Sequence, residues 1–448
     1  MQARTKDMTQ GSPLRLILMF SLPIIAGNLF QQFYSLVDTF VIGRVEGVAA
    51  LAAVSAAGWM DWMVLSLAMG LAQGFAIELA QRFGAGDYTG LRHAAGQSVT
   101  LAVMIVAVLG VLAQVFLRPL LVLIKTPIDT LDLTEHYLRI IFAGMPLVMA
   151  YNLFSGALRS VGNSRTPLIA MTSAALCNIV LDILFVAWFG WGVTGVATAT
   201  VISQGVSCLI CLFALARLPI LRVTGPDMKP HVPTMRRLMS LGVPVAFQNL
   251  IISVGGLILQ SVVNGFGFLF MAGFNAATRL TGLIELGGTS LGSAMGTFAG
   301  QNLGAGKLDR VRQGLRRSAQ VAFGLALAVG VCMILFGRPL LSLFIEDDPA
   351  VVEQVLTIGA RYLYIASIGL PMLYLLFVYR STLQGLGDTM IPMLSGFMEL
   401  AMRIGCILLL PMFIGEWGVY IAEISAWIGA AILLMWGYYR RMRLLERR

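Results

Sequence analysis

Charged residues are scarce in this sequence. Asp, Glu, Lys and Arg together make up 12% of its 448 residues, whereas 58% are hydrophobic and the mean hydropathy is +0.84. A soluble domain needs far more charge to cover its surface. About 20 mainly apolar residues cross a bilayer as one helix. The composition therefore excludes a soluble globular class and predicts a membrane protein with many spans.

Histidine and nucleotide-binding motifs are also nearly absent. Of three histidines, His93 and His231 fall in predicted loops and His136 at the end of a predicted span, so no buried histidine relay is available. There is no Walker motif, which excludes ATP-driven transport by this chain itself. Neither a His/Asp metal cluster nor a nucleophile with a base occurs within the spans. We predict that the chain is not an enzyme and binds no cofactor.

The five cysteines all lie in apolar stretches. Cys208 and Cys211 form a CxxC motif, which in other contexts indicates redox or metal chemistry. Because there is no second pair and no nearby histidine, we interpret them as packed membrane cysteines.

Hydropathy, broken at charge clusters and at Gly and Pro, predicts an all-α membrane protein with twelve spans. Their approximate ranges are 14–42, 48–80, 94–117, 133–155, 166–189, 192–216, 238–264, 269–300, 315–336, 356–379, 390–413 and 417–439.

Lys and Arg are distributed unequally between the two sides of these spans. One side holds only Arg44, Arg118, Lys125 and Arg338, with an acidic cluster at 346–348; the other holds most of the rest, including Arg380 and the basic tail 440–448. The rich side is expected to be cytoplasmic. This predicts a multi-pass protein of the cell (inner) membrane with both termini inside, and it explains the net charge of +9 without a nucleic-acid partner.

The two halves of the sequence resemble each other. Phe116–Leu121 recurs as Phe336–Leu341, Gly84–Gly86 as Gly304–Gly306, Gly144–Pro146 as Gly369–Pro371, and Pro23 with Asn28 matches Pro244 with Asn249. Six spans per half make the repeats parallel, related by pseudo-two-fold symmetry along the membrane normal. The predicted divisions are a six-helix lobe at 1–216, a proline-rich cytoplasmic linker at 217–237 and a six-helix lobe with a basic tail at 238–448.

Ionisable groups inside spans cost roughly 2.5–3.5 kcal/mol each on insertion scales, so each is a candidate functional residue. The candidates are Asp38, Asp61, Glu78, Asp182, Arg279, Glu285, Glu399, Arg403 and Glu423.

Asp182 has the most informative surroundings. Asn178 lies four residues earlier on the same helix face, and a turn at Phe189–Gly192 places Asp182 and Thr200 at one depth on two antiparallel helices. Asp38 lies close to the outer end of span one. Asp38, Asn178, Asp182 and Thr200 are predicted to converge in a cation site, for a hard metal ion such as Na⁺ or for a proton shared by two carboxylates. The alternative is that each is a satisfied packing residue.

The remaining candidates leave more alternatives open. Glu399 and Arg403 are predicted to pair across one helical turn, for structure or for function. Glu285 and Glu423 either face a second-lobe cleft and attract cationic substrates or are hydrogen-bonded structural groups. Glu78 is interpreted as part of a solvated face, and Asp61 as a membrane-interface residue.

Several segments together carry a family resemblance. They are Asn28–Arg44, the span-ending loops Ala80–Asp87 and Ala299–Lys307, and the matched loops Leu158–Pro167 and Leu383–Pro392. With these motifs in this order, from about Ser12 to Tyr439, the chain resembles the multidrug and toxin extrusion (MATE) transporters.

The resemblance implies a V-shaped pair of six-helix lobes that exports drugs and organic cations in exchange for Na⁺ or H⁺. Asp38, Asn178, Asp182 and Thr200 match the family's first-lobe cation site, and Glu399 with Arg403 resembles a Glu/Arg pair of some bacterial members. The chain departs from members with further acids in the seventh and tenth spans. The expected partners are small-molecule drugs or organic cations and the lipid bilayer, with no obligate protein partner.

The predicted mechanism is antiport by alternating access, in which cation and drug prefer different conformations. Pro23 is expected to let span one bend. The alternative function is a lipid-linked sugar flippase of the related class, which would need a strongly cationic cleft. The intramembrane bases Arg139, Arg279, Arg361 and Arg403 are scattered, which counts against it.

Overall fold

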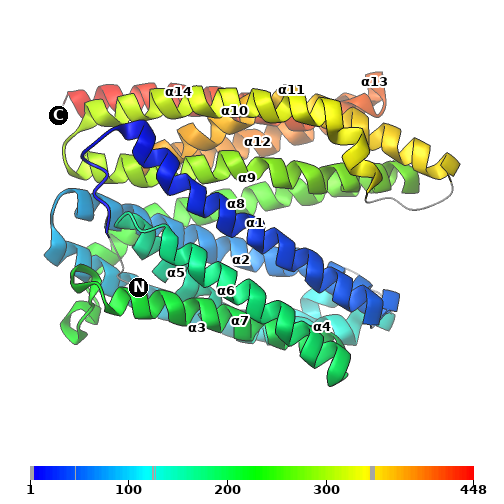
Figure 1. The fold of residues 1–448 in the computed structure, drawn as a ribbon, viewed down its shortest axis with the longest axis horizontal. Helices are drawn as coiled ribbons and strands as arrows, with labels where there is room; N and C mark the ends of the chain where they lie inside the picture. The colour runs from blue at the N-terminus through cyan, green and yellow to red at the C-terminus, as the bar shows by residue number, and fades with distance from the viewer. Residues whose placement is uncertain (1–4, 46, 124–125, 127, 344–348, 448) are drawn as a thin grey trace. The chain divides into compact units, whose positions relative to one another are not determined.

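The computed structural model describes residues 5–45, 47–123, 126, 128–343 and 349–447. Within these residues the chain is helical and contains no strand, which confirms the predicted all-α class (Figure 1). Lys125 and the acidic cluster at 346–348 lie outside the described residues.

The helices follow the twelve predicted spans closely. The first half contains α1 (Pro13–Val45), α2 (Gly47–Gly84), α3 (Tyr88–Leu123), α4 (Ile128–Ala143), α5 (Met145–Ser160), α6 (Arg165–Asp182), the π-helical η1 (Ile183–Trp188) and α7 (Gly192–Ala216). Two short 3₁₀ turns, η2 (Pro219–Leu221) and η3 (Gly225–Met228), follow. The second half contains α8 (Val232–Gly265), α9 (Phe268–Gly304), α10 (Leu308–Ser342), α11 (Pro349–Gly385), α12 (Met390–Leu409), α13 (Pro411–Ile414) and α14 (Trp417–Glu446).

Length and composition support membrane crossing. Among the described helices, ten are long and apolar enough to cross a membrane, and eleven if the bent pair α4 and α5 forms one span. That pair turns by 44° where Gly144 separates the two helices. Pro146 stands in the first turn of α5, where a missing N–H is tolerated. Its repeat partner Pro371 lies inside the continuous helix α11.

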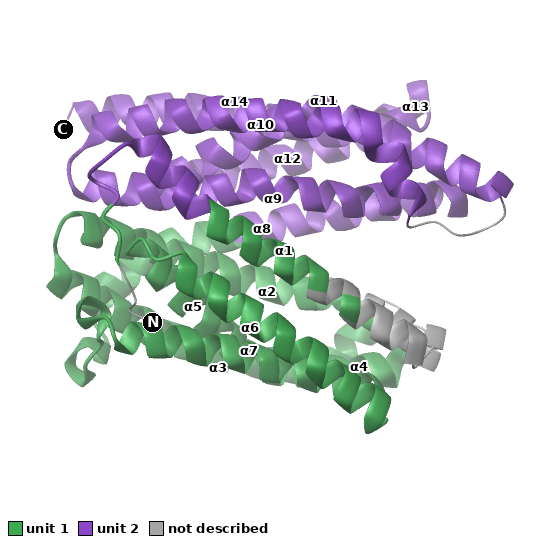
Figure 2. Cartoon of the chain, viewed as in Figure 1, with its two compact units in different colours: residues 1–7, 22–246 green, residues 8–21, 247–448 purple. Residues whose placement is uncertain are grey.

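The chain forms two compact units (Figure 2). Unit 1 comprises Met1–Asp7 and Leu22–Ala246, and unit 2 comprises Met8–Ser21 and Phe247–Arg448. Both α1 and α8 pass from one unit to the other near their internal prolines, Pro23 and Pro244. The first part of α8 therefore belongs to unit 1 and the start of α1 to unit 2. Lobes bounded at 216 and 238 remain a proposal.

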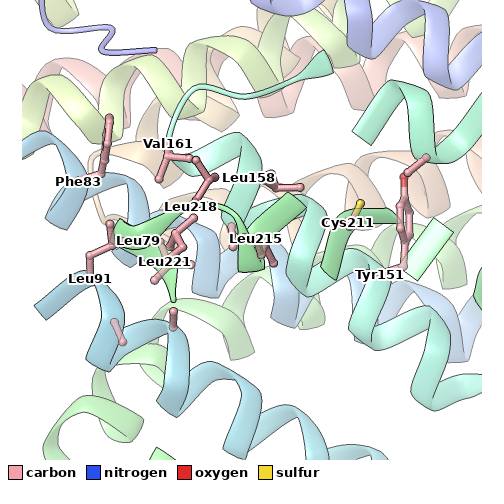
Figure 3. Packing of buried hydrophobic residues seen from close by; sticks show 14 of the residues in the cluster. Leu79, Phe83, Leu91, Tyr151, Leu158, Val161, Cys211, Leu215, Leu218 and Leu221 are labelled. Carbon is pink, nitrogen blue, oxygen red and sulfur yellow. The ribbon is translucent and has the colours of Figure 1, made fainter. Parts of the chain in front are cut away.

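The segment 217–237 is built into unit 1. Leu218 and Leu221 are buried in an apolar cluster with residues of α2, α3, α5 and α7, including Leu79, Leu91, Leu158 and Cys211 (Figure 3). Cys208 belongs to the same cluster and is a free thiol, so the CxxC cysteines pack as predicted.

Polar contacts fix the second part of this segment to α3. Gln97 is fully buried, and its side-chain amide donates to the backbone carbonyls of Asp227 at 2.8 Å and Lys229 at 2.6 Å. Its carbonyl oxygen accepts from the backbone N–H of His231 at 2.9 Å. Thr100 donates to the carbonyl of Met228 at 2.9 Å. The segment that composition marks as a linker is thus seated on unit 1.

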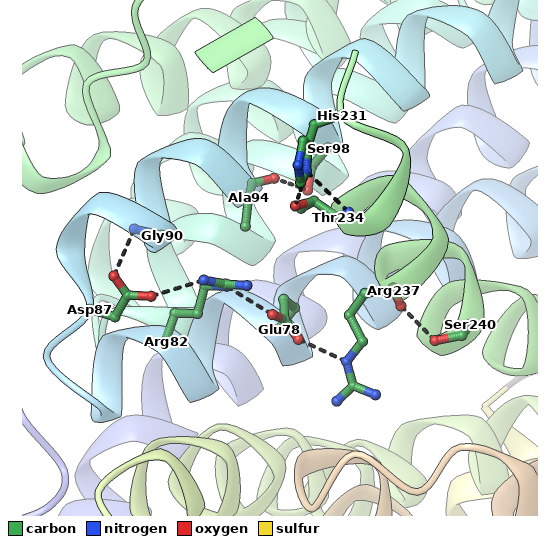
Figure 4. A network of polar contacts seen from close by, with 10 residues as sticks. All are labelled: Glu78, Arg82, Asp87, Gly90, Ala94, Ser98, His231, Thr234, Arg237 and Ser240. Carbon is green, nitrogen blue, oxygen red and sulfur yellow. Dashed lines mark hydrogen bonds and ion pairs between the residues drawn. The ribbon is translucent and has the colours of Figure 1, made fainter. Parts of the chain in front are cut away.

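A charged network lies at the same end of unit 1 (Figure 4). Glu78 accepts from Arg82 at 2.8 Å and from Arg237 of α8 at 3.1 Å, and Arg82 also contacts Asp87 at 2.9 Å. Glu78 is 6% exposed, so its interpretation as a solvated residue is wrong. Its environment is buried because the start of α8 covers it, a contact that span two alone does not reveal.

In unit 2 the N-terminal segment is held in a comparable way. The backbone N–H of Met8 donates to Gln301 at 2.8 Å, and Asn302 donates to the Met8 carbonyl at 3.2 Å. Lys307 donates to the carbonyl of Thr9 at 3.0 Å, and Arg310 to that of Gly11 at 2.9 Å. Residues 8–11 are therefore an integral part of the end of unit 2.

Candidate functional site

The candidate cation site lies on α6 and α7 of unit 1, which pack against each other. Asn178 and Asp182 share one face of α6 and are 1% and 0% exposed. The turn at Phe189–Gly192 is present, preceded by the π-helical segment η1 directly after Asp182. Such π-helical segments frequently occur at functional sites.

Asn178 and Thr200 lie together, whereas the turn had predicted Asp182 at the depth of Thr200, and that pairing stays a prediction. They line a cavity of about 10 Å³ between α6 and α7, together with Ser203 and Gln204. This volume suits a single occupant the size of a water molecule. Both side-chain atoms of Asn178 that can hydrogen-bond are buried and have no partner among the described residues. An unsatisfied buried polar group costs about 1–3 kcal/mol, so this amide fits an oxygen ligand to a bound cation.

A larger cavity adjoins this place. It has a volume of about 190 Å³ and is also lined by Thr200 and Gln204. Its other polar lining residues come from α1, α2, α5 and the position just before α6: Asn28, Gln31, Asp61, Asn152, Ser155, Arg159 and Ser164.

Asp61 was interpreted as a membrane-interface residue, and its depth in the membrane stays a prediction. It lines the larger cavity, and its Oδ1 is buried without a partner among the described residues, so its side chain faces inward. The neighbouring Trp62 is 53% exposed and points to another face of α2. The flanking Trp62 suggested a position at the membrane interface, but the side chain of Asp61 faces inward. The free-energy cost of placing an acid in a span was the better indication of a functional residue.

Asp38 lies in α1 among the residues whose side chains fall outside the description. Its place beside Asn178, Asp182 and Thr200 therefore stays a prediction. The cavity lining does bring α1 to this region, through Asn28 and Gln31.

Unit 2 contains the other predicted polar residues, on α9, α12 and α14. The Tyr362 hydroxyl of α11 donates to Glu423 of α14 at 2.5 Å. Glu285 of α9 is half-buried, and its charged neighbours are Glu423, Arg403 and Glu399. The structure thus brings all four predicted residues of the second lobe into one neighbourhood.

The predicted Glu399–Arg403 pair is wrong. Glu399 is instead paired with Arg380 of α11, which also contacts Ser395. Arg380 is 7% exposed and lies within α11, so it is not one of the loop cations that indicate topology. The Nε of Arg403 is buried without a partner in the described part of the chain. The partner of this carboxylate therefore comes from the neighbouring helix α11 and not from the same helix one turn away.

The MatE family model matches this chain twice, at residues 23–184 and 244–406. The two matches begin at Pro23 and Pro244, the pair that the internal repeat aligns. Together they cover most of both halves, so the repeat in the sequence is the repeat of the family.

Known proteins agree with this match. The probable multidrug resistance protein YpnP of Bacillus subtilis is 32% identical, over 85% of this chain and 84% of that protein. The FAD transporter of Shewanella oneidensis is 29% identical over 76% of each chain. Among solved structures, a MOP superfamily transporter from Pyrococcus furiosus has the same fold, with a TM-score of 0.92 over 99% of both chains at 24% identity.

These findings favour the MATE family over the lipid-linked sugar flippase. They identify an integral membrane transporter rather than an enzyme. The chain belongs to the MatE family of multidrug and toxin extrusion transporters.

Proposed function

We propose that this chain exports drugs or organic cations by exchange for Na⁺ or H⁺, with Asp38, Asn178, Asp182 and Thr200 as its cation-coupling site. The names of relatives such as YpnP support a multidrug substrate range. The family needs no bound cofactor beyond the coupling ion, and the substrates are expected to be small molecules.

The observation that carries the proposal is the side chain of Asn178. It is buried, unpartnered among the described residues, and lines a small cavity with the hydroxyl-bearing Thr200. Amide, hydroxyl and carboxylate oxygens suit a hard cation such as Na⁺. Asp182, fully buried one turn further along α6, would supply negative charge. A proton carried by the carboxylates is the other coupling mode.

Asp61 supports a cationic substrate. It places a carboxylate on the wall of the 190 Å³ cavity that also reaches Thr200. Cation and substrate would then compete through charge in one region, so that binding of one favours release of the other. Arg159 lines the same cavity and adds a positive charge to its wall. An anionic substrate such as FAD is therefore the alternative to test.

The proposed location is the cell (inner) membrane with both termini in the cytoplasm. The basis is the positive-inside rule. Arg82, Arg92, Arg159 and Arg165 lie at helix ends on one side of unit 1, as does the segment 217–237. The tail of α14 ends in the basic stretch 440–448.

The test uses the full chain in liposomes loaded with a fluorescent organic cation. Dye release is followed under an imposed Na⁺ gradient and, separately, under a pH gradient. One gradient should drive release, and Asp38→Asn and Asp182→Asn should each abolish it. Asp309→Asn, which removes an exposed acid of α10, is the matched control and should transport normally.

The same liposomes loaded with FAD test the anionic substrate. Release of FAD without release of the dye would contradict the organic-cation proposal. Full gradient-driven dye release by Asp182→Asn would contradict the coupling site.

A further inference from the structure

Unit 2 contains a cavity that the transport site does not use. It has a volume of about 660 Å³ and lies at the basic end of the unit, on α10, α11 and α14. Arginine and tyrosine dominate its polar lining: Arg312, Arg316, Tyr379, Tyr438 and Tyr439. In Figure 1 these three helices run side by side over most of their length, and α10 and α14 both pack on α11.

The charge of this cavity is positive. Arg312 is paired with Glu446 and with Asp309, and so is largely neutralised. Arg316 is exposed and makes no hydrogen bond or ion pair with any residue in the described ranges. Tyr438 is only 2% exposed, and its buried hydroxyl lacks a hydrogen-bond partner among the same residues. A free cation thus lines the cavity, and an unsatisfied hydroxyl belongs to a residue of its wall.

The internal repeat shows how the matching surface of unit 1 is used. The alignment of Gly84–Gly86 with Gly304–Gly306 pairs Gly96 with Arg316 and Thr100 with Gln320. In unit 1 this face of α3 is covered by η3. A Cβ on Gly96 would lie 2.5 Å from the carbonyl oxygen of Asp227, and Thr100 donates to Met228.

In unit 2 the matching face of α10 carries Arg316 in place of the glycine. Arg316 and Gln320 are both exposed, so no segment of the described chain covers this face as η3 covers that of α3. The long cation in place of a glycine indicates that this face takes a different, anionic occupant.

The apolar side of α10 indicates what kind of anion. Beyond the arginines the same helix exposes Phe323 (45%), Leu327 (49%) and Val331 (53%). Phe323 also lines the cavity. The cavity therefore joins a lipid-facing apolar helix surface to a cationic end that, on the orientation proposed above, meets the cytoplasmic leaflet. Basic pockets between helices on that side bind lipid head groups.

We propose that this cavity binds the head group of an anionic phospholipid, with its phosphate on Arg316 and Tyr438 and its acyl chains along Phe323 and Leu327 of α10. Guanidinium and phenol hydroxyl both donate to phosphate oxygens. Tyr439 is exposed and adds an amphipathic ring to the lining of the same cavity.

The experiment titrates delipidated full-length protein in a non-ionic detergent with dioleoylphosphatidylglycerol and counts bound lipids by native mass spectrometry. Arg316→Gln should weaken binding of the most tightly bound lipid about fivefold, which is the contribution of one arginine near an anionic head group. Arg317→Gln is the matched control, because it removes the same charge from the next residue, which does not line the cavity. Its effect should stay within about twofold.

Tyr438→Phe provides a second variant that keeps the packing and removes only the hydroxyl. This variant should also bind phosphatidylglycerol more weakly. Its unfolding temperature should not fall, because the hydroxyl has no hydrogen-bond partner to lose.

Three results would overturn the proposal. The first is an equal loss of phosphatidylglycerol affinity in Arg316→Gln and Arg317→Gln. The second is binding of dioleoylphosphatidylcholine as tight as that of dioleoylphosphatidylglycerol. The third is binding of inorganic phosphate with the same dependence on Arg316. The last would assign the site to a free anion. Because lipid binding is measured without a gradient or a drug, it stands or falls separately from the exporter function.

Discussion

Gly74 of α2 and Gly242 of α8 lie in direct backbone contact: a Cβ on Gly74 would stand 2.3 Å from the Cα of Gly242. One turn away, a Cβ on Gly70 would stand 2.5 Å from the Cα of Ala246. Small residues at this spacing let two membrane helices approach closely. This seam attaches the first part of α8 to unit 1.

Gly74→Leu is therefore expected to force α2 and α8 apart. Overpacking of this kind costs about 1–3 kcal/mol, and the expected result is a lower unfolding temperature in detergent. Gly58→Ala on the same helix is the control, since a Cβ there meets no atom within 4 Å. An unchanged unfolding temperature for Gly74→Leu would contradict the tight seam.

Asn178→Leu tests the cation site through stability rather than transport. The substitution keeps the size of the side chain and removes an amide that has no partner in the described part of the chain. In a Na⁺-free buffer, stability should be unchanged or higher, because an unsatisfied polar group is removed. Added Na⁺ should raise the unfolding temperature of the unmodified protein but not that of the variant.

Asn152→Leu is the control for that experiment. Asn152 lines the larger cavity, and its amide already donates to the carbonyl of Val148 at 2.9 Å. Its replacement should leave the response to Na⁺ intact. If Asn178→Leu kept a full Na⁺ response, the amide would not be a ligand.

Glu78 is expected to hold α8 to α2 through Arg237. Glu78→Gln should lower stability by about 1–3 kcal/mol, since it weakens two charge-assisted hydrogen bonds to a buried group. In a double-mutant cycle with Arg237→Gln, a favourable coupling energy should appear. The exposed Arg312–Asp309 pair, treated in the same way, should give less than about 0.5 kcal/mol.

Asp227 is expected to make the attachment of the segment 217–237 to unit 1 sensitive to acid. The side-chain and backbone donors of Thr224, at 2.6 and 2.9 Å, lower the pKa of Asp227, and the charges of Arg92 and His93 act in the same direction. Since the folded pKa lies below the unfolded value of about 3.9, the stabilisation is complete above that value. It is lost as the pH falls through the folded pKa.

Pepsin cleavage within 222–231 measures this effect. Cleavage of the unmodified protein should rise between about pH 4.5 and pH 2.5, and the rise should be smaller in Asp227→Asn, which cannot titrate. Asp309→Asn should behave like the unmodified protein. The same rise in Asp227→Asn would exclude Asp227 as the group responsible.

Hydropathy predicted the spans well because membrane helices must satisfy every backbone group internally. The turns that end α2 and α9 were predictable from their glycines. Gly86 and Gly306 have φ values of 73° and 70°, a conformation that favours glycine, and the repeated motif marks both. The short turn at 189–192 predicted Asp182 at the depth of Thr200, but the residue of α6 that shares a cavity with Thr200 is Asn178, one turn earlier.

Partner choice between helices was beyond local sequence reasoning. Spacing favoured Arg403 as the partner of Glu399, but Arg380 from a different helix holds that carboxylate. The interpretation of Glu78 as a solvated residue failed in the same way, because its burial depends on α8, a helix distant in sequence. The prolines of 217–237 predicted a lobe boundary, which stays a prediction; the packing of Leu218 and Leu221 into unit 1 was not foreseen.

The exchange of segments between the two units changes how the molecule can be divided. A gene cut in the 217–237 segment would produce a first fragment without the stretch of α8 that seals α2. The second fragment would lack Met8–Ser21, whose carbonyls bind Asn302, Lys307 and Arg310. Neither half of the sequence therefore contains every segment of one unit.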